Sequence, residues 1–403
     1  MWNFMKLFQR LLVAPAALGL LAPITANANE VNFNAISNYS DVESLEFANS
    51  FDDTFDNNVE FEPLIAGGEG MVHDHDTDSF SETTTASFSL DVGLGAIDGQ
   101  NVTTTVTDGD EALTLSYGFQ IDLNTSFTGE DSLDISLDAG NGLLGELDLN
   151  SGSEALTVDG VSYTFPVGDK TTVFVGDNTD GSALYSTACV YGGITNTLDD
   201  CGNVNSALGS GNGTAAGASF DIGNGFTAAI GYTGEGSSDK GLLSKESADA
   251  FGGQLTYTAD SYGLSATYAN IESTTSASDT TAAADSDVTY WALNGYWTPS
   301  ESGSMPSISV GYETGDSEAA STKDTSTFFV GLQWDEVGPG TFGAAMGTTG
   351  HISDGATEYY MYEAFYSYPV NDGMTITPVV YVKELASPKM DETGVMVKTS
   401  FSF

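Results

Sequence analysis

Side chains that can attract or repel ions recur at a spacing of two residues in this sequence. In the stretch LTLSYGFQIDL (113–123) amide and carboxyl groups alternate with apolar side chains, and SLDISLDAGN (132–141) repeats the arrangement. A spacing of two places such groups on one face of a β-strand. Acids on a wetted face attract cations and repel anions. The candidates for lining a pore are Gln120, Asp122, Asp134, Asp138, Lys383 and Lys398.

Residues suited to catalysis or metal binding are few. The histidines are His73, His75 and His351, and the chain has no nucleophile elbow, zinc-protease helix motif or phosphate-binding loop. The sequence HDHD (73–76) offers ligands that suit zinc, nickel or iron. Adjacent residues in an extended linker rarely hold a metal tightly, so we favour a solvated polar stretch. We therefore predict no enzyme activity, no metal site and no cofactor; a lipase or protease barrel is the enzymatic alternative.

The elements that must position the polar candidates are strands. Odd positions from Leu113 to Leu123 are all apolar, and even positions between them are all small or polar. Similar segments of about 8–11 residues, the length of a tilted strand that crosses a bilayer, continue to the final ETGVMVKTSFSF. Long polar inserts alternate with short turns such as PVNDG, as on the two rims of a barrel. The long inserts lie at 178–216, 272–287 and 314–326.

This pattern predicts an all-β fold, a transmembrane antiparallel β-barrel of about 16 strands (14–18), over residues 84–403. The rival interpretations are a secreted lectin-like sandwich and a β-solenoid. A single sheet of so many strands must curl or pair, and the sequence lacks the regular repeat of a solenoid. A closed barrel with lipid outside and water inside satisfies both faces of every strand.

Residues 1–28 have the features of a secretory signal peptide. Lys6 and Arg10 supply the positive charge, Leu11 to Leu21 the apolar stretch, and Ala26 to Ala28 the small residues before a cleavage site. The apolar run is shorter than the ~20 residues that a membrane-spanning helix needs. We expect export across the inner membrane, followed by insertion into the outer membrane.

The exported chain is strongly acidic. Without residues 1–28 it has seven lysines, no arginine and all 57 acidic residues, a net charge of −50. Phosphate binding needs Lys and Arg, so nucleic acid is excluded as a partner class. Residues 29–83 are acidic and rich in asparagine and lack sustained alternation. We predict that they form a periplasmic or linker segment.

Cys189 and Cys201 lie close together in TACVYGGITNTLDDCGN. In an exported chain an isolated pair of this kind predicts a disulfide that closes one loop, external or folded inward. Two free thiols are the alternative.

Three stretches carry a family resemblance: SFTGEDSLDISLDAGN (126–141), STACVYGGITNTLDDCGN (186–203) and YEAFYSYPVNDGMTITPVVYV (362–382). Together with the leader, they resemble the porins of marine cyanobacteria, distant relatives of the carbohydrate-selective porin family. The resemblance covers residues 84–403. It implies a homotrimeric barrel in outer-membrane lipid that passes small hydrophilic solutes and ions. The surface-layer-homology domain common in the family is not evident in residues 29–83.

The expected function is passive diffusion of small solutes and inorganic ions, with a preference for cations because of the excess of acids. The alternative is a structural or adhesive outer-membrane barrel with a plugged lumen. The alternating last strand ends on Phe401 and Phe403, which fits the signal that outer-membrane assembly machinery accepts.

Overall fold

The computed structural model describes part of the chain: residues 83–99, 112–141, 144–149, 154–202, 213–234, 241–243, 249–272, 287–300, 305–317, 323–386 and 391–403. All of them belong to the unit Gly68–Phe403. The predicted signal peptide, the predicted acidic segment except Thr83, and the HDHD sequence lie outside the described residues.

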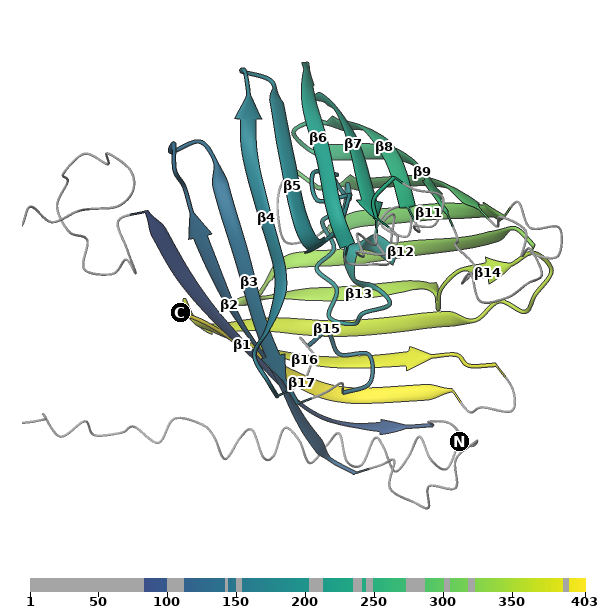
Figure 1. Ribbon diagram of the computed structural model, residues 1–403. Coiled ribbons are helices and arrows are strands. Elements are labelled where there is room, and N and C mark those ends of the chain that lie inside the picture. Colours follow the sequence, from purple (N-terminus) through teal and green to yellow (C-terminus); the bar gives the residue numbers. More distant parts are fainter. Residues whose placement is uncertain are drawn as a thin grey trace, which may run out of the picture. The chain divides into compact units, whose positions relative to one another are not determined.

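The described residues form strands connected in simple sequence order (Figure 1). One short 3-10 helix, η3 (Asp199–Gly202), accompanies them. The strands are β1 (Thr84–Asp98), β2 (Thr114–Thr125), β3 (Ser132–Gly140), β4 (Thr157–Val167), β5 (Thr171–Thr179), β6 (Gly213–Gly223), β7 (Phe226–Gly234), β8 (Asp249–Thr258), β9 (Tyr262–Ile271), β10 (Val288–Trp297), β11 (Ser307–Ser317), β12 (Thr325–Val337), β13 (Gly340–Thr348), β14 (Ile352–Ser353), β15 (Tyr360–Asn371), β16 (Met374–Lys383) and β17 (Glu392–Ser402).

The sheet closes on itself. Each strand pairs antiparallel with its neighbours, and β1 pairs with both β2 and β17. The two-residue β14 only extends the edge of β12, so sixteen strands form the barrel wall. Closure leaves no unpaired edge, which a sheet in lipid requires because nothing there can bond an exposed backbone amide. The predicted barrel of about 16 strands is confirmed.

The two rims differ. One rim carries short turns, such as 168–170, 224–225 and 372–373, and the other carries the long connections 180–212 and 272–287. The chain ends at the short-turn rim, where Phe403 and Phe88 exchange backbone hydrogen bonds of 2.9 and 3.0 Å and their rings stack. The predicted segregation of long inserts and short turns is present, but the insert predicted at 314–326 is only the connection 318–324, because β11 continues to Ser317 and β12 begins at Thr325.

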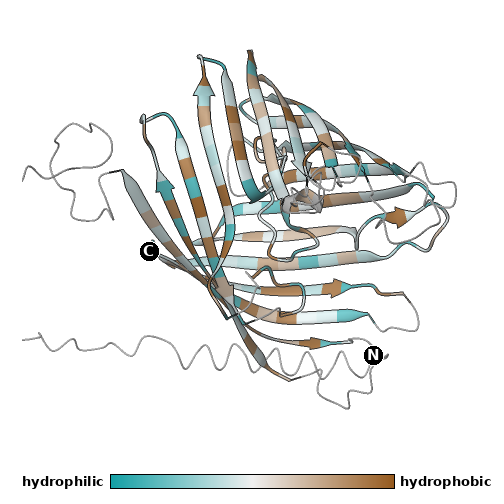
Figure 2. Cartoon of the chain, in the orientation of Figure 1, coloured by the Kyte–Doolittle hydropathy of each residue, from teal (hydrophilic) through white to brown (hydrophobic). Residues whose placement is uncertain are grey.

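Hydrophobic and hydrophilic residues alternate along the strands of the wall (Figure 2). The outer face is apolar and exposed, with Ile230, Leu264 and Leu293 each more than half exposed. The inner face of the same strands carries buried polar groups such as Gln254, Ser265 and Asn294. This arrangement fits lipid outside and water or polar loops inside. No helix within the described residues is both long enough and apolar enough to cross a membrane.

The turn between β2 and β3 is built around Asp131, which is buried. Its Oδ1 accepts hydrogen bonds from the Ser126 hydroxyl and from the amides of Phe127 and Thr128, at 2.8–2.9 Å. Its Oδ2 accepts the Tyr163 hydroxyl at 2.6 Å. These donors, Tyr163 foremost, hold the pKa of Asp131 well below the usual carboxyl range, against the opposing effect of burial.

We expect Asp131→Asn to lower the unfolding midpoint at neutral pH. In acid the difference between the variant and the wild-type protein should become small. The folded pKa lies below the ordinary value of ~3.9, so the ionised group stabilises the fold fully above about pH 4. That contribution falls as the pH drops toward the folded pKa. Unfolding midpoints in detergent at pH 7, 4 and 2 check this, with the exposed Asp169→Asn as control. A difference that stays constant down to pH 2 would contradict it.

Candidate functional site

Residues 180–202, which follow β5, fold into the barrel and are named the inner loop here. The loop follows the inner wall from β7 to β12. Its position is fixed by four backbone amides that donate to wall side chains: Gly181 to Thr233 (2.7 Å), Ser186 to Gln254 (2.7 Å), Val190 to Ser309 (3.1 Å) and Gly192 to Gln333 (3.0 Å). These contacts place loop backbone over much of the polar inner face.

Glu363 on β15 anchors the inner loop through both oxygens of its carboxylate. The hydroxyls of Tyr191 and Thr195 donate to its two carboxylate oxygens, each at 2.6 Å. Glu363 is only 4% exposed. A buried carboxylate needs such donors, because an unsatisfied charge in a dry environment is costly. Both hydroxyls would lose their acceptor if Glu363 were removed.

The disulfide joins Cys189 to Cys201, with Cα atoms 5.9 Å apart. It encloses Tyr191 and Thr195, the two residues that hold Glu363. Cys201 is fully buried and its carbonyl lies over Gly311 on β11, where a side chain would collide with it. The crosslink therefore constrains the part of the loop that contacts the wall.

Replacing both cysteines by serine should disturb the channel more than the barrel. Closing a loop of this size stabilises by ~3 kcal/mol in the chain-entropy model, and that constraint acts on the inner loop. The strands' hydrogen bonds do not depend on it. We expect greater current noise in single-channel records with little change in the unfolding midpoint. Reductant should raise the current noise of the wild-type protein to that of the variant, and it should leave the noise of the variant unchanged. Alkylation of both wild-type thiols without reductant would contradict the crosslink.

A second connection also enters the barrel. Residues 144–149, between β3 and β4, are named the second inner loop here. Asp148 donates its amide to the Ile194 carbonyl (3.1 Å), and Asn196 donates to the Glu146 carbonyl (2.9 Å). A β-bridge links Leu147 to Thr195. The two loops are thus paired to each other inside the barrel.

An apolar cluster joins both loops to one side of the wall. Gly93 on β1 leaves room for Leu147, since a Cβ there would lie 2.6 Å from that side chain. The cluster has six buried residues from the loops, Leu144, Leu147, Leu149, Tyr191, Leu198 and Cys201, and its main wall members are Phe329, Met361, Phe365, Val379, Tyr381 and Met396. The inner faces of β12 and β15–β17 are therefore partly apolar, which a water-filled interior does not predict. The reason is that loops, rather than water, cover them.

Lys383 and Lys398 lie on the inner face, and both are paired. Lys383 forms an ion pair with Glu146 and also contacts Thr197. Lys398 pairs with Asp91 at 3.0 Å and donates to the Asp148 carbonyl at 2.9 Å. The lysines proposed from sequence as lining residues thus hold the second inner loop to β16 and β17.

The remaining sequence candidates lie together on the inner face of β2 and β3. Asp122 accepts hydrogen bonds from Gln120 and Ser136, both at 2.7 Å, and the register pairs Gln120 with Asp138. Asp134 accepts the Ser132 hydroxyl at 2.6 Å. We name Asp122, Asp134, Asp138 and Asp159 of β4 the acidic wall.

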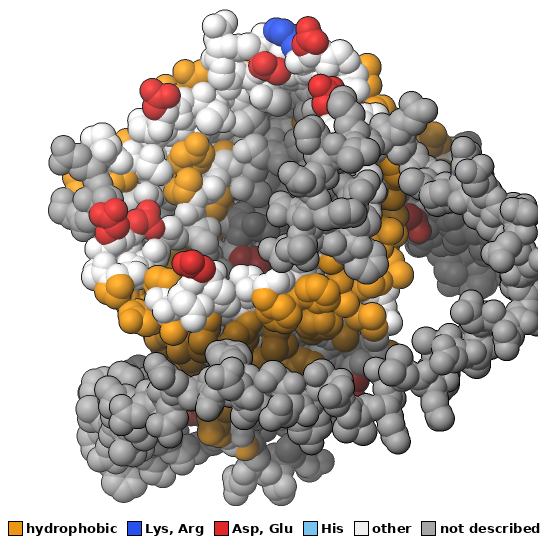
Figure 3. Space-filling model, turned by 90° about the vertical axis from the view of Figure 1, so that its left-hand side faces the viewer, with side chains coloured by type: hydrophobic (Ala, Val, Ile, Leu, Met, Phe, Trp, Pro, Cys, Tyr) orange, Lys and Arg blue, Asp and Glu red, His pale blue; other side chains and the backbone are white. Residues whose placement is uncertain are grey.

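A cavity of about 250 Å³ lies against the acidic wall. Its polar lining includes Asp134, Ser136, Asp159, Ser162 and Asp180. On the face drawn in Figure 3, acidic side chains far outnumber basic ones around the hollow. The inner face of β2–β4, which follows β1 in the barrel wall, thus offers polar, negatively charged surface beside the apolar cluster.

Of the three histidines in the sequence, only His351 lies within the residues that the structure describes. Its Nε2 lies 2.7 Å from the buried Glu313 and its Nδ1 lies 2.9 Å from Thr325. Among the described residues, no three His, Cys, Asp or Glu side chains are grouped to hold a metal.

Sequence reasoning missed Glu146 and Glu363. Glu363 had a signal, because it is the one charged residue in the aromatic stretch YYMYEAFYSYPV. An acid on the inner face of such a strand needs a buried partner. Glu146 had no signal, since its role depends on a contact with Lys383, which is distant in the sequence.

The barrel and its inward-folded connections define a porin-type β-barrel. No family model matches the chain, and no curated protein matches it in sequence. Among solved structures it is similar to an anion-selective porin from Comamonas acidovorans (TM-score 0.56, 12% identity, covering 80% of this chain and 99% of that one). It is also similar to OprB of Pseudomonas putida (TM-score 0.55, 10% identity, covering 80% of this chain and 94% of that one). A third similar structure is OmpF of Salmonella typhi (TM-score 0.51, 13% identity, covering 80% of this chain and 98% of that one). At such identities the likeness concerns the fold.

Proposed function

We propose that the protein is an outer-membrane porin that lets small hydrophilic solutes and inorganic ions diffuse passively. The observation that carries this proposal is the uneven interior of the closed barrel. The two inner loops contact β7, β8, β11, β12, β15–β17 and β1, while acidic side chains line β2–β4 and a polar cavity lies against β3–β5. An apolar outer face supports residence in lipid. The short-turn rim then faces the periplasm.

The charges favour cations. The acidic wall carries four carboxylates, and the two inner-face lysines among the described residues are paired with acids. The described Lys170 and Lys323 lie in exposed connections outside the lumen wall. Carboxylates beside a passage attract cations and repel anions. The anion selectivity of the Comamonas porin belongs to that protein, and a shared fold does not transfer selectivity.

Recording in planar lipid bilayers tests the proposal. Purified protein should give discrete current steps, and the reversal potential across a salt gradient should show cation preference that grows as salt is diluted. A structural or adhesive barrel with a sealed lumen would give no steps. Steps with anion preference would retain the channel and refute the cation preference.

We also propose that the protein assembles as a homotrimer, as its resemblance to porins implies. Light scattering of the detergent-solubilised protein, with the detergent mass subtracted, measures the number of chains. A mass equal to one chain would refute the proposed trimer and would leave the proposed channel function unaffected.

A further inference from the structure

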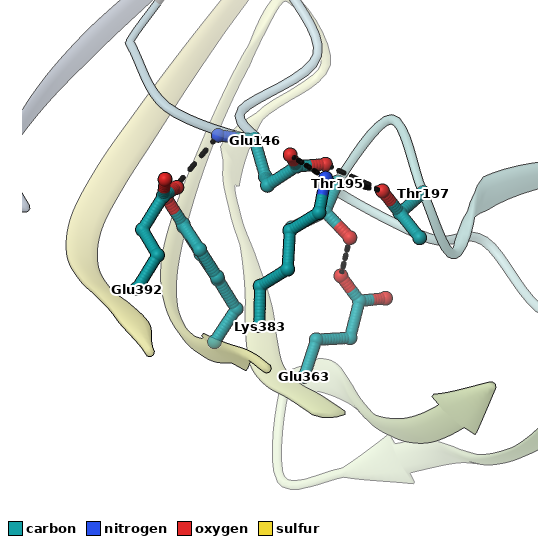
Figure 4. Close-up of polar contacts among 7 residues, drawn as sticks. Glu146, Thr195, Thr197, Glu363, Lys383 and Glu392 are labelled. Carbon is teal, nitrogen blue, oxygen red and sulfur yellow. Dashed lines mark hydrogen bonds and ion pairs between the residues drawn. The ribbon is translucent and has the colours of Figure 1, made fainter. Parts of the chain in front are cut away.

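Glu146 has a polar partner for every polar atom it carries, and these partners come from β16 and from the inner loop; Figure 4 shows its contacts with Lys383 and Thr197. Its carboxylate receives the Lys383 ammonium from β16 and, at 2.6 Å, the Thr197 hydroxyl from the inner loop. Its amide donates to the Tyr381 hydroxyl at 3.3 Å. Its carbonyl accepts the Asn196 amide at 2.9 Å. Glu146 thus joins both inner loops to the barrel wall.

The ion pair lies in a partly buried place. The side chains of Lys383 and Glu146 are 20% and 14% exposed. Removing either partner would leave the other charge with little access to water, which is strongly unfavourable. The loop would then have to move to hydrate the remaining charge. The pair as a whole is neutral, so it exerts little net field on an ion that passes at a distance.

We propose that Glu146 and Lys383 are positioning residues that hold the two inner loops against β16 and so set the width of the passage. This inference rests on the proposed channel function. In this view the two charged residues determine the largest solute that can pass, and the acidic wall determines the ion preference. A neighbouring ion pair joins Lys398 of β17 to Asp91 of β1. Lys398 also donates to the Asp148 carbonyl, so it holds the second inner loop in place from β17.

Two substitutions with opposite charge changes test the proposal. Glu146→Gln removes a negative charge and Lys383→Met removes a positive one, but both break the same contact. If the residues act by position, both variants should admit larger neutral polymers and show more current noise than wild type. If they act as point charges, the variants should shift the reversal potential in opposite directions with an unchanged polymer cut-off, which would overturn the proposal.

Matched controls carry the same charge changes away from the loops. Glu130→Gln and Lys170→Met lie in exposed turns on the opposite, short-turn rim. They should leave the polymer cut-off at the wild-type value. The double variant Glu146→Gln/Lys383→Met should widen the passage no more than either single variant, because it removes the same contact and leaves no buried charge without a partner. Additive widening would mean that the residues act independently and would overturn the proposal.

Amide hydrogen exchange in detergent supplies a readout that needs no conduction. The amides of Asp148 and Asn196 make the bonds that pair the loops. Their exchange should be at least severalfold faster in both single variants, while strand amides keep their wild-type rates. Unchanged exchange at both amides would refute the positioning role even in a conducting protein. Wild-type protein without current steps would instead refute the proposed channel, and the exchange rates would still decide the positioning role.

Discussion

Replacing Asp122, Asp134 and Asp138 together by asparagine should reduce the cation-over-anion permeability ratio by roughly threefold to tenfold in 0.1 M salt. An ion ~10 Å from one carboxylate interacts with it by about 0.4 kcal/mol at the dielectric constant of water and about 1.7 kcal/mol at a value of 20. Three such charges, partly screened, add up to the expected change, because 1.4 kcal/mol is a factor of ten. Asparagine keeps an acceptor oxygen for the Gln120 and Ser136 donors, so the local structure should persist.

Salt dependence separates this explanation from a general effect of net charge. The Debye length falls from ~10 Å at 0.1 M to ~3 Å at 1 M, so the difference from wild type should shrink in 1 M salt. The matched control replaces three exposed aspartates of the short-turn rim, Asp169, Asp260 and Asp372, by asparagine. It should change the reversal potential much less. An equal shift in the control variant would show that the acidic wall has no special role.

Replacing Glu363 by alanine should release the inner loop and raise the single-channel conductance severalfold. The hydroxyls of Tyr191 and Thr195 would lose their acceptor inside the barrel. A buried donor without a partner costs about 1–3 kcal/mol, so the loop gains by moving into water. The sixteen strands do not depend on this contact, and we expect β-sheet circular dichroism to stay at the wild-type level. Conductance and the polymer cut-off measure the change.

Two further variants test whether loss of the acceptor for Tyr191 and Thr195 causes the increase in conductance. Glu363→Gln keeps one acceptor oxygen and should give a smaller increase in conductance than the alanine variant. Glu154→Ala, at an exposed position in the connection that precedes β4, removes the same charge without touching either inner loop and should conduct like wild type. The anchoring role is wrong if Glu363→Ala conducts like wild type while its circular dichroism is unchanged.

Alternation in the sequence was enough to predict the barrel wall. In β2 the apolar side chains from Leu115 to Leu123 and the polar ones between them lie on opposite faces. This succeeded because a strand has a side-chain period of two and lipid tolerates few polar groups. The same reasoning was incomplete for β15, where Met361 and Phe365 face inward beside Glu363. Their environment is a folded loop, which local alternation cannot reveal.

The sequence by itself determined the barrel, its number of strands within a narrow range, the two kinds of rim, and the excess of acids. These follow from local periodicity, segment length and composition. Only the tertiary structure decided that 144–149 and 180–202 fold inward, that Lys383 and Lys398 bind acids, and that Asp122, Asp134 and Asp138 stay outside the apolar cluster. The reason is that partners such as Glu146 and Lys383 are far apart along the chain. Barrel closure brings them together, and no local pattern encodes such a contact.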